Sequence, residues 1–397
     1  MDISASFPVL LLTGPRQIGK TTLLEKLAEE GRNYVSLDDL DERSLAQQDP
    51  ALFLQTHKPP LIIDEVQYAP ILFSYIKMYV DKHKISGLFW LTGSQKFHLM
   101  KGIQESLAGR VAIIDMLGLS GKEIENKAKE SVPFLPSRKW LKESSEHKSE
   151  EKNLQDIYSA IWNGGFPKLI VDDNKNRDIF YRSYIRTYIE RDVKDSYNIS
   201  DNIGFYNFFR AIAARTGQLL NYADIAKDVG VDPKTAKIWM SILERSGIIY
   251  LLYPYYNNVT KRIIKTPKVY FLDTGLCSYL TAWDSPKTLE AGAMSGAILE
   301  TYVFSEILKS YWHNGQEPNI YFYRDNDQKE VDFLIEANGK IYPIEVKKTA
   351  TPSLAATKNF SVLKNLKKDI ESGVIFCLRP EIIPISQNIM SLPVCLI

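Results

Sequence analysis

The sequence is poor in cysteine, in net charge and in long apolar runs. Its 397 residues include three cysteines, Cys277, Cys377 and Cys395, and no two of them have the Cys-x-x-Cys spacing of a zinc site. Three cysteines cannot all pair with one another. Neither a disulfide framework nor a zinc ribbon is therefore expected, and a reducing compartment is favoured.

Signals for membrane insertion or export are also missing. No stretch approaches the roughly 20 consecutive apolar residues that span a bilayer. The N-terminal sequence MDISASFP contains an acid and no basic residue, whereas a secretory signal starts with basic residues ahead of an apolar core. The sequence predicts a cytoplasmic protein with no membrane partner.

Charge of neither sign dominates. The chain has 49 Lys and Arg against 48 Asp and Glu, a net charge of +1, which excludes a wholly basic nucleic-acid coat but leaves room for a local basic patch. Hydrophobic residues make up 45% and charged residues 24%, so a sizeable core can form. At roughly 150 residues per domain, the length predicts two or three domains.

The order of short apolar runs predicts an α/β chain of several parts. In the first 120 residues, β-like runs at 7–13, 34–37, 60–63 and 88–92 alternate with helical stretches, which is typical of a parallel, doubly wound sheet. The predicted divisions are a P-loop domain at 1–120, a charged linker or spacer at 121–153, a helical and helix-turn-helix domain at 154–285, and a C-terminal α/β domain at 286–397.

A phosphate-binding pattern follows the first β-like run. Residues 14–21 satisfy G-x-x-x-x-G-K-[ST] and open the helical sequence TTLLEKLAEE, which is the strand–loop–helix context that the pattern requires. Gly14 and Gly19 let backbone N–H groups turn toward phosphate oxygens. Lys20 would neutralise the β- and γ-phosphates of ATP, and the Thr21 hydroxyl would bind Mg²⁺. The predicted nucleotide-binding residues of this segment are Gly14, Pro15, Arg16, Gln17, Ile18, Gly19, Lys20, Thr21 and Thr22.

Polar residues end the next two apolar runs. Asp64 and Glu65 follow LII, at the carboxyl end of a strand, where parallel sheets bind ligands. We expect Asp64 to hold Mg²⁺ and Glu65 to orient the attacking water. Ser94 or Gln95, after FWLTG, would sense the γ-phosphate. Arg110 would act as an arginine finger on a neighbouring subunit of a homo-oligomer, with a surface arginine as the equal alternative.

Residues 222–252 predict two short helices followed by strands. Asp232 and Pro233 suit the N-cap and first turn of the second helix, and Gly247 suits its end. Four positions are expected to face inward: Ala226, Val231, Ile238 and Leu243. Lysines and a threonine at the start of the second helix would face DNA, with a basic run nearby, and a purely structural or protein-contact role is the alternative. These outward residues are Lys234, Thr235, Lys237, Lys261, Arg262, Lys265 and Lys268.

A hairpin is predicted where Asn-Gly at 338–339 joins two alternating runs, 330–337 and 340–347. Its two-residue turn pairs 337 with 340 and 334 with 343, and it places Asp332 opposite Glu345 with Cβ atoms roughly 5 Å apart. Opposed like charges are destabilising unless a divalent cation lies between them or one acid is protonated. Lys347 shares the face of Glu345 because it is two residues along the strand.

Two carboxylates and one amine on one face suit a metal and phosphate site. Asp332 and Glu345 would hold Mg²⁺ or Mn²⁺, which acidifies a bound water and stabilises a pentavalent phosphate. Lys347 would stabilise that charge or position the water. A hydrated surface hairpin and a retained fold with an inactive site are the alternatives.

Two resemblances cover these motifs. GPRQIGKTT, LIIDEVQ, LTGSQKF and SLAGR resemble a large prokaryotic group of AAA-type ATPases, over nearly the whole chain. This resemblance implies an ATPase followed by a winged helix and a restriction-endonuclease-like module. The D…E-x-K arrangement is similar to the PD-(D/E)XK nuclease superfamily, which implies a further helical carboxylate, matched by Glu300 better than by Glu306.

The leading hypothesis is an ATP-binding and ATP-hydrolysing protein whose nucleotide state controls a metal-dependent nuclease-like module acting on DNA. The rival is a nucleotide-switched regulator that binds DNA or a protein partner and cleaves nothing.

Overall fold

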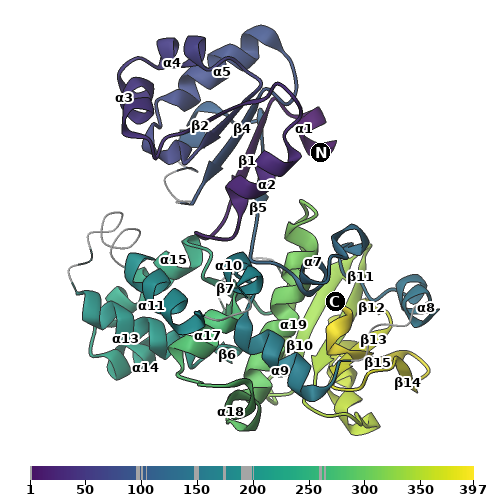
Figure 1. Ribbon diagram of the computed structural model, residues 1–397. Helices are drawn as coiled ribbons and strands as arrows, with labels where there is room; N and C mark the ends of the chain where they lie inside the picture. The colour runs from purple at the N-terminus through teal and green to yellow at the C-terminus, as the bar shows by residue number, and fades with distance from the viewer. Residues whose placement is uncertain are drawn as a thin grey trace. The chain divides into compact units, whose positions relative to one another are not determined.

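The computed structural model describes residues 2–94, 99, 102–103, 105–146, 152–172, 176–188, 199, 201–258, 262 and 265–397 (Figure 1). Contacts divide the chain into two compact units, Met1–Gly118 with Arg245–Gly247, and Leu119–Glu244 with Ile248–Ile397. Over the described ranges, no helix combines the length and apolar character that crossing a membrane requires.

The first unit contains a five-stranded sheet in the order β2-β3-β4-β1-β5, with every neighbouring pair parallel. This confirms the predicted parallel α/β fold of the N-terminal part. The strands are β1 (Val9–Thr13), β2 (Asn33–Ser36), β3 (Leu61–Asp64), β4 (Phe89–Gly93) and β5 (Val111–Asp115). The first four lie within two residues of their predicted positions. The sequence analysis missed β5, an edge strand whose residues are partly exposed and therefore lack a fully apolar run.

Alternating side chains of the central strand β1 enter two separate cores. Val9 and Leu11 join one cluster, and Leu10 and Leu12 join the other, because successive side chains of a strand point to opposite faces. The helices of this unit are α1 (Asp2–Ser6), α2 (Lys20–Leu27), α3 (Leu40–Gln48), α4 (Pro50–Thr56), η1 (Val66–Tyr68) and α5 (Leu72–His83).

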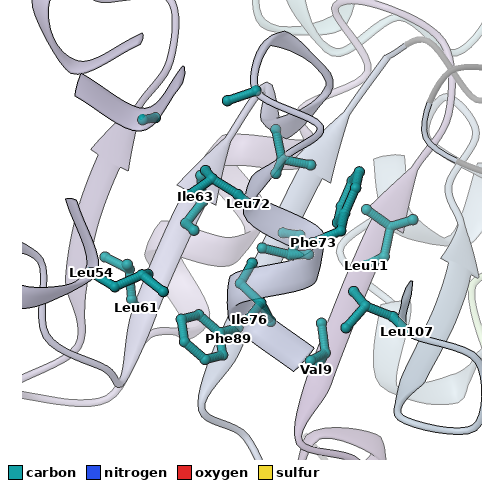
Figure 2. Packing of buried hydrophobic residues seen from close by; sticks show 14 of the residues in the cluster. Val9, Leu11, Leu54, Leu61, Ile63, Leu72, Phe73, Ile76, Phe89 and Leu107 are labelled. Atoms are coloured by element: carbon teal, nitrogen blue, oxygen red, sulfur yellow. The ribbon is translucent and has the colours of Figure 1, made fainter. Parts of the chain in front are cut away.

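Helix α5 covers one face of this sheet with an apolar stripe. Figure 2 shows Leu72, Phe73 and Ile76 of α5 beside Phe89 and Leu11 of the strands. The i, i+1, i+4 spacing places the three helix residues on one side. Burying each of these side chains contributes about 1.5–3 kcal/mol, so the packing holds the strands, and the loops that follow them, in fixed positions.

The second unit begins with helices and a small sheet. Its helical part comprises α9 (Leu154–Asn163), α10 (Pro167–Val171), α11 (Arg177–Thr187), α13 (Asn202–Ala213), α14 (Tyr222–Val229), α15 (Pro233–Arg245), α17 (Thr274–Leu280) and α18 (Pro286–Ala291). An antiparallel sheet in the order β6-β8-β7 follows α14 and α15. Its strands are β6 (Gln218–Leu219), β7 (Ile249–Leu252) and β8 (Lys268–Phe271).

Helices α14 and α15 cover the two helical ranges that the sequence predicts. Asp232 caps α15 by accepting the N–H groups of Lys234 and Thr235 at 2.8 and 3.1 Å, and Gly230 ends α14 with φ +77°. Ala226 and Leu243 are buried as expected. Ile238 is 58% exposed, so its inward placement was wrong.

The correction at Ile238 follows from helical periodicity. The buried residues of α15 are Ala236, Trp239, Met240, Ile242 and Leu243. Four of them, Ala236, Trp239, Met240 and Leu243, form an i, i+3, i+4, i+7 stripe, and Ile238 lies two residues from its first member, on the other side of the helix.

A mixed sheet forms the C-terminal part of the second unit. Its order is β14-β15-β13-β11-β10-β9, with β12 beside β11. The hairpin pair β10–β11 is antiparallel, and β11, β13 and β15 run parallel. The strands are β9 (Ile320–Arg324), β10 (Glu330–Ala337), β11 (Lys340–Val346), β12 (Asp369–Ile370), β13 (Gly373–Cys377), β14 (Ile383–Ser386) and β15 (Ile389–Pro393), with the short helices η4 (Leu354–Leu366) and η5 (Val394–Leu396).

The long helix α19 (Ser295–Trp312) is buried along most of its length. The stretch predicted as a charged spacer contains α7 (Gly121–Ile124), η2 (Ala128–Glu130) and α8 (Arg138–Glu146), and it contacts α19. Gly121 N–H donates to Glu306 at 2.8 Å, and Phe134 N–H donates to Ser310 at 3.0 Å. Glu306 also pairs with Lys309 at 2.7 Å. Its carboxylate is therefore committed to contacts that hold the chain together.

Candidate functional site

The phosphate-binding loop lies between β1 and α2, as predicted. Gly14 has φ +146°, and a Cβ there would meet the Met116 carbonyl oxygen at 2.1 Å, so only glycine fits. Gly19 has φ +88° and precedes the first residue of α2. The Lys20 ammonium donates to the carbonyls of Gly14 and Pro15 at 3.0 and 2.7 Å. The Lys20 side chain therefore folds back onto the loop in which the phosphates of a nucleotide would bind.

Asp64, at the carboxyl end of β3, collects hydroxyl groups from three elements. Thr21 Oγ1 donates to its two oxygens at 3.0 and 3.1 Å, Tyr34 Oη donates at 3.2 Å, and Thr92 Oγ1 also donates. Burial and the Asp64 carboxylate raise the pKa of Tyr34 to about 12, which keeps the phenol a donor. The structure thus joins Thr21 and Asp64, the two predicted Mg²⁺ ligands.

Glu65 sits beside this pair in a left-handed conformation with φ +53°. Its N–H donates to Thr92 Oγ1 at 3.3 Å, and its carboxylate accepts from Gln67 and from Ser94 Oγ, the latter at 3.3 Å. A non-glycine residue at positive φ is costly and is found where surrounding contacts fix it. The carboxylate is therefore held in a set direction next to the phosphate loop.

The remaining nucleotide-site predictions fall in different places. The Ser94 hydroxyl donates to the Glu65 carboxylate, whereas Gln95 lies outside the described residues. Arg110 forms a two-pronged ion pair with Asp81, with N–O distances of 2.5 and 2.9 Å. Its role as an arginine finger stays a prediction.

The C-terminal hairpin has the register that its Asn-Gly turn predicts. Ala337 pairs with Lys340 and Leu334 with Pro343, and the ladder runs on to Phe333 and Ile344. One step further, Asp332 Oδ2 accepts the N–H of Val346 at 2.8 Å. A register shift in the β9–β10 pairing falls between Val331 and Leu334. Such bulges redirect side chains and recur beside functional sites.

Glu345 lies on a central strand of the sheet and is completely buried. Neither of its oxygens has a hydrogen-bond partner of good geometry, although the Lys347 ammonium lies 2.5 Å from Oε2 and 3.8 Å from Asp332 Oδ2. Burial and the Asp332 carboxylate raise the pKa of Glu345. The predicted trio of Asp332, Glu345 and Lys347 is therefore in one place.

Glu300 reaches the same cluster from α19. Its Oε1 accepts from Tyr270 Oη at 2.5 Å and from the Lys268 ammonium at 3.2 Å. Lys268 also pairs with Glu330 at 2.5 Å. Burial and, to a smaller extent, the charge of Asp332 raise the pKa of Glu300.

Lys268 corrects the predicted basic run. Its side chain is buried, with 3% of the residue exposed, and its ammonium forms ion pairs with two acids. It therefore cannot serve as an outward DNA contact. Burial would lower the pKa of Lys268, but Glu300 and Glu330 outweigh that effect and raise it. Lys265 is exposed, Arg262 pairs with Glu336 at 3.3 Å, and Lys261 lies outside the described residues.

The sequence analysis missed several partners of both sites. Tyr34 and Gln67 are single polar residues with no pattern around them. Lys268 and Tyr270 occupy alternate positions of an otherwise apolar strand, and this polar spacing was the available signal. Glu330, at the start of β10, is two residues from Asp332 and so shares its side of a regular strand.

Three family models match successive parts of the chain. Residues 154–287 match a domain of unknown function, DUF8612, and residues 295–397 match another, DUF4143. Residues 6–125 match a model described as an AAA domain, over the segment in which Lys20, Thr21 and Asp64 converge. The N-terminal unit is an AAA-type ATPase domain. For such a domain the nucleotide is ATP, usually with Mg²⁺.

Two mycobacterial relatives extend the similarity beyond the AAA domain. The uncharacterized proteins Mb2031c of Mycobacterium bovis and Rv2008c of Mycobacterium tuberculosis are each 28% identical to this chain over 393 residues, 97% of this chain and 80% of theirs.

Two solved structures show weak overall likeness. A RuvB variant from Thermotoga maritima is 18% identical with a TM-score of 0.30, and the match covers 61% of this chain and 81% of that one. Protein VC1899 from Vibrio cholerae is 13% identical with a TM-score of 0.19, covering 94% and 89%. TM-scores this low carry no argument about fold or function.

Proposed function

We propose that this chain is an AAA-type ATPase whose nucleotide state controls a C-terminal, metal-dependent nuclease-like module that acts on DNA. The observation that carries the nuclease-like half is the buried pair of acids Glu345 and Asp332, which share the Lys347 ammonium at 2.5 Å from Glu345 Oε2 and 3.8 Å from Asp332 Oδ2.

In the AAA domain, the geometry supports roles for Lys20, Thr21, Asp64 and Glu65. Lys20 is placed to exchange its two carbonyl contacts for phosphate oxygens, and the loop N–H groups would cradle those oxygens. Thr21 and Asp64 would hold Mg²⁺, which neutralises phosphate charge when bound. Glu65, held by Gln67 and Ser94, would orient the attacking water.

The C-terminal site fits a divalent ion through two protein ligands. Over the described ranges, no three His, Cys, Asp or Glu side chains are arranged to hold a metal. Buried carboxylates are costly unless cations compensate them, and the one ammonium of Lys347 faces both Glu345 and Asp332, which leaves negative charge for a divalent ion to compensate. The two acids would hold Mg²⁺ or Mn²⁺, which would acidify a water. Lys347 would face the phosphate.

The DNA contact is proposed for the exposed start of α15. Lys234, Lys237 and Ile238 are exposed on one side of that helix, where a recognition helix of this type meets the major groove. Ile238 adds an apolar side chain that suits a thymine methyl group. Replacing both lysines with alanine is expected to weaken DNA binding and to reduce its salt slope by about 2. The K139A/K142A pair on α8 has the same i, i+3 spacing and serves as the matched control.

Cleavage of plasmid and branched DNA tests the function directly. The protein is incubated with each substrate and Mg²⁺ or Mn²⁺, with and without ATP. We expect ATP-dependent cleavage that is lost in D332N while ATP binding persists. The control D327N, which changes an exposed acid of the β9–β10 turn, should cleave like the wild type. ATP turnover without cleavage on every substrate and with both metals would reject the nuclease.

The rival, a nucleotide-switched binding protein that cuts nothing, is favoured by one specific observation. Lys347 and Lys268 already lie within ion-pair distance of Glu345 and Glu300, so two of the acids have a built-in cation. This rival predicts nucleotide-dependent DNA or partner binding that D332N leaves unchanged.

A further inference from the structure

We propose that Lys268 is a positioning residue of the acidic site, a built-in counter-ion that holds Glu300 away from a divalent ion. The proposal rests on the proposed function, since it assigns a partner to the same cluster. Its consequence is that the metal affinity of the site depends on a residue of the small sheet that follows the helix-turn-helix.

The contacts of Lys268 are specific and buried. Its ammonium lies 3.2 Å from Glu300 Oε1 and 2.5 Å from Glu330 Oε1, and its side chain is 4% exposed. Tyr270 Oη donates to the same Glu300 oxygen at 2.5 Å. Two donors therefore occupy the Glu300 oxygen that would otherwise be offered to a metal.

Strand β8 determines where this lysine lies. Lys268 and Tyr270 are two residues apart, so both side chains project from one face of the strand. The strand is held on both sides, because Lys268 pairs with Leu219 of β6 and with Leu252 of β7. The acidic site is thus assembled from the small sheet, α19 and the hairpin together.

Charge balance gives the lysine its role. Four carboxylates gather here, from Glu300, Glu330, Asp332 and Glu345, against three cations: the ammonium groups of Lys268 and Lys347, and the Arg324 guanidinium, which lies 3.8 Å from Glu330. Removing one partner of a buried ion pair leaves an uncompensated charge. Without Lys268, the carboxylates of Glu300 and Glu330 would attract another cation, and a divalent ion would supply it.

Binding of Mn²⁺, followed by electron paramagnetic resonance in nucleotide-free protein, tests this role. We expect K268Q to bind Mn²⁺ about tenfold more tightly than the wild type, because the Glu300 carboxylate that Lys268 neutralises would then be free to attract the ion. K268R should behave like the wild type. The double variant K268Q/E300Q should lose the gain, since the freed carboxylate is its source.

Other outcomes are distinguishable. Unchanged or weaker Mn²⁺ binding in folded K268Q, or a gain that persists in K268Q/E300Q, would overturn the role of Lys268. Wild-type Mn²⁺ binding that D332N leaves intact would instead count against the proposed metal site. Should K268Q not fold, Y270F keeps the ring and removes only the other donor to Glu300. A two- to threefold tightening, of the order of one lost hydrogen bond, supports the proposal, and no tightening contradicts it.

Discussion

The two candidate sites compensate charge in opposite ways. In the AAA domain, Lys20 is satisfied by backbone carbonyls and Asp64 by hydroxyl groups, so neutral dipoles surround each charge. In the C-terminal site, carboxylates face one another and lysines, and Glu345 keeps oxygens without hydrogen bonds. The first arrangement is ready for a charged ligand at little electrostatic cost. The second stores like-charge repulsion that a cation relieves.

The comparison predicts the largest single effect at Glu65. E65Q keeps the shape and the hydrogen-bonding capacity of the side chain but removes the charge that would polarise water. ATP hydrolysis should fall about 10²- to 10⁴-fold, while ATP binding stays within a few-fold. Phosphate release and nucleotide titration measure the two quantities.

The control for this variant is S94A, which removes one hydrogen bond to Glu65 and should cost far less activity. If E65Q hydrolysed ATP at the wild-type rate, water activation would have to come from another group.

The pH dependence of Mn²⁺ binding sharpens the contrast at the second site. The pKa of Glu345 is raised by burial and by Asp332, so in the metal-free protein the proton is retained to a higher pH than usual. Metal and proton compete for the carboxylate. Affinity should therefore rise with pH, by up to about tenfold per pH unit while one proton is displaced, until the raised pKa is passed.

A calorimetric or resonance titration at several pH values measures this slope. Affinity that is flat or falls with pH would show that Glu345 does not bind the ion.

Replacing the Glu345 carboxylate should increase the free energy of unfolding of the metal-free protein. E345Q removes a carboxylate whose charged form is disfavoured by burial and by Asp332, while the Lys347 side chain is 37% exposed and can remain solvated, so the variant is expected to stabilise the metal-free protein by about 1–2 kcal/mol. A raised pKa means that the folded state binds more protons than the unfolded state, so stability falls as pH rises through this range. The gain in E345Q should therefore be larger at alkaline than at mildly acidic pH.

Thermal unfolding of E345Q and wild type, with and without Mn²⁺, measures this gain. Destabilisation of E345Q in metal-free buffer would mean that Lys347 fully compensates the charge.

The smallest effect is expected at Tyr34. Y34F removes one of the hydroxyl groups that donate to Asp64 and should weaken Mg²⁺–ATP binding by about three- to tenfold, the range of one ordinary hydrogen bond. Nucleotide titration with and without Mg²⁺ separates this from a loss of folding. An equal loss of nucleotide affinity without Mg²⁺ would show that Tyr34 does not act through the Mg²⁺ site.

The two sites also differ in how well sequence alone predicts them. The phosphate loop depends on residues 14–21 and on backbone geometry, so a local pattern identified it, and the turn at 338–339 fixed the hairpin register in the same way. Lys268 and Tyr270 are far along the chain from the acids that they contact. No local pattern specifies such long-range pairing, and the lysine looked like part of a surface run.

The burial of Glu345 was also beyond sequence reasoning. Its flanking residues predict an alternating strand, but they do not show that β11 is an interior strand of the sheet, between β10 and β13. The outward turn of Ile238 could have been read from the spacing of the apolar residues in α15, which places it off the buried stripe.

The chain order of the two sites has a consequence for synthesis on the ribosome. Every residue described at the phosphate loop lies within the first 118 positions, whereas the acidic cluster draws on Lys268, Glu300 and the hairpin through Lys347. Domains fold largely as they emerge. A growing chain would thus be able to capture nucleotide long before it could assemble the acidic cluster.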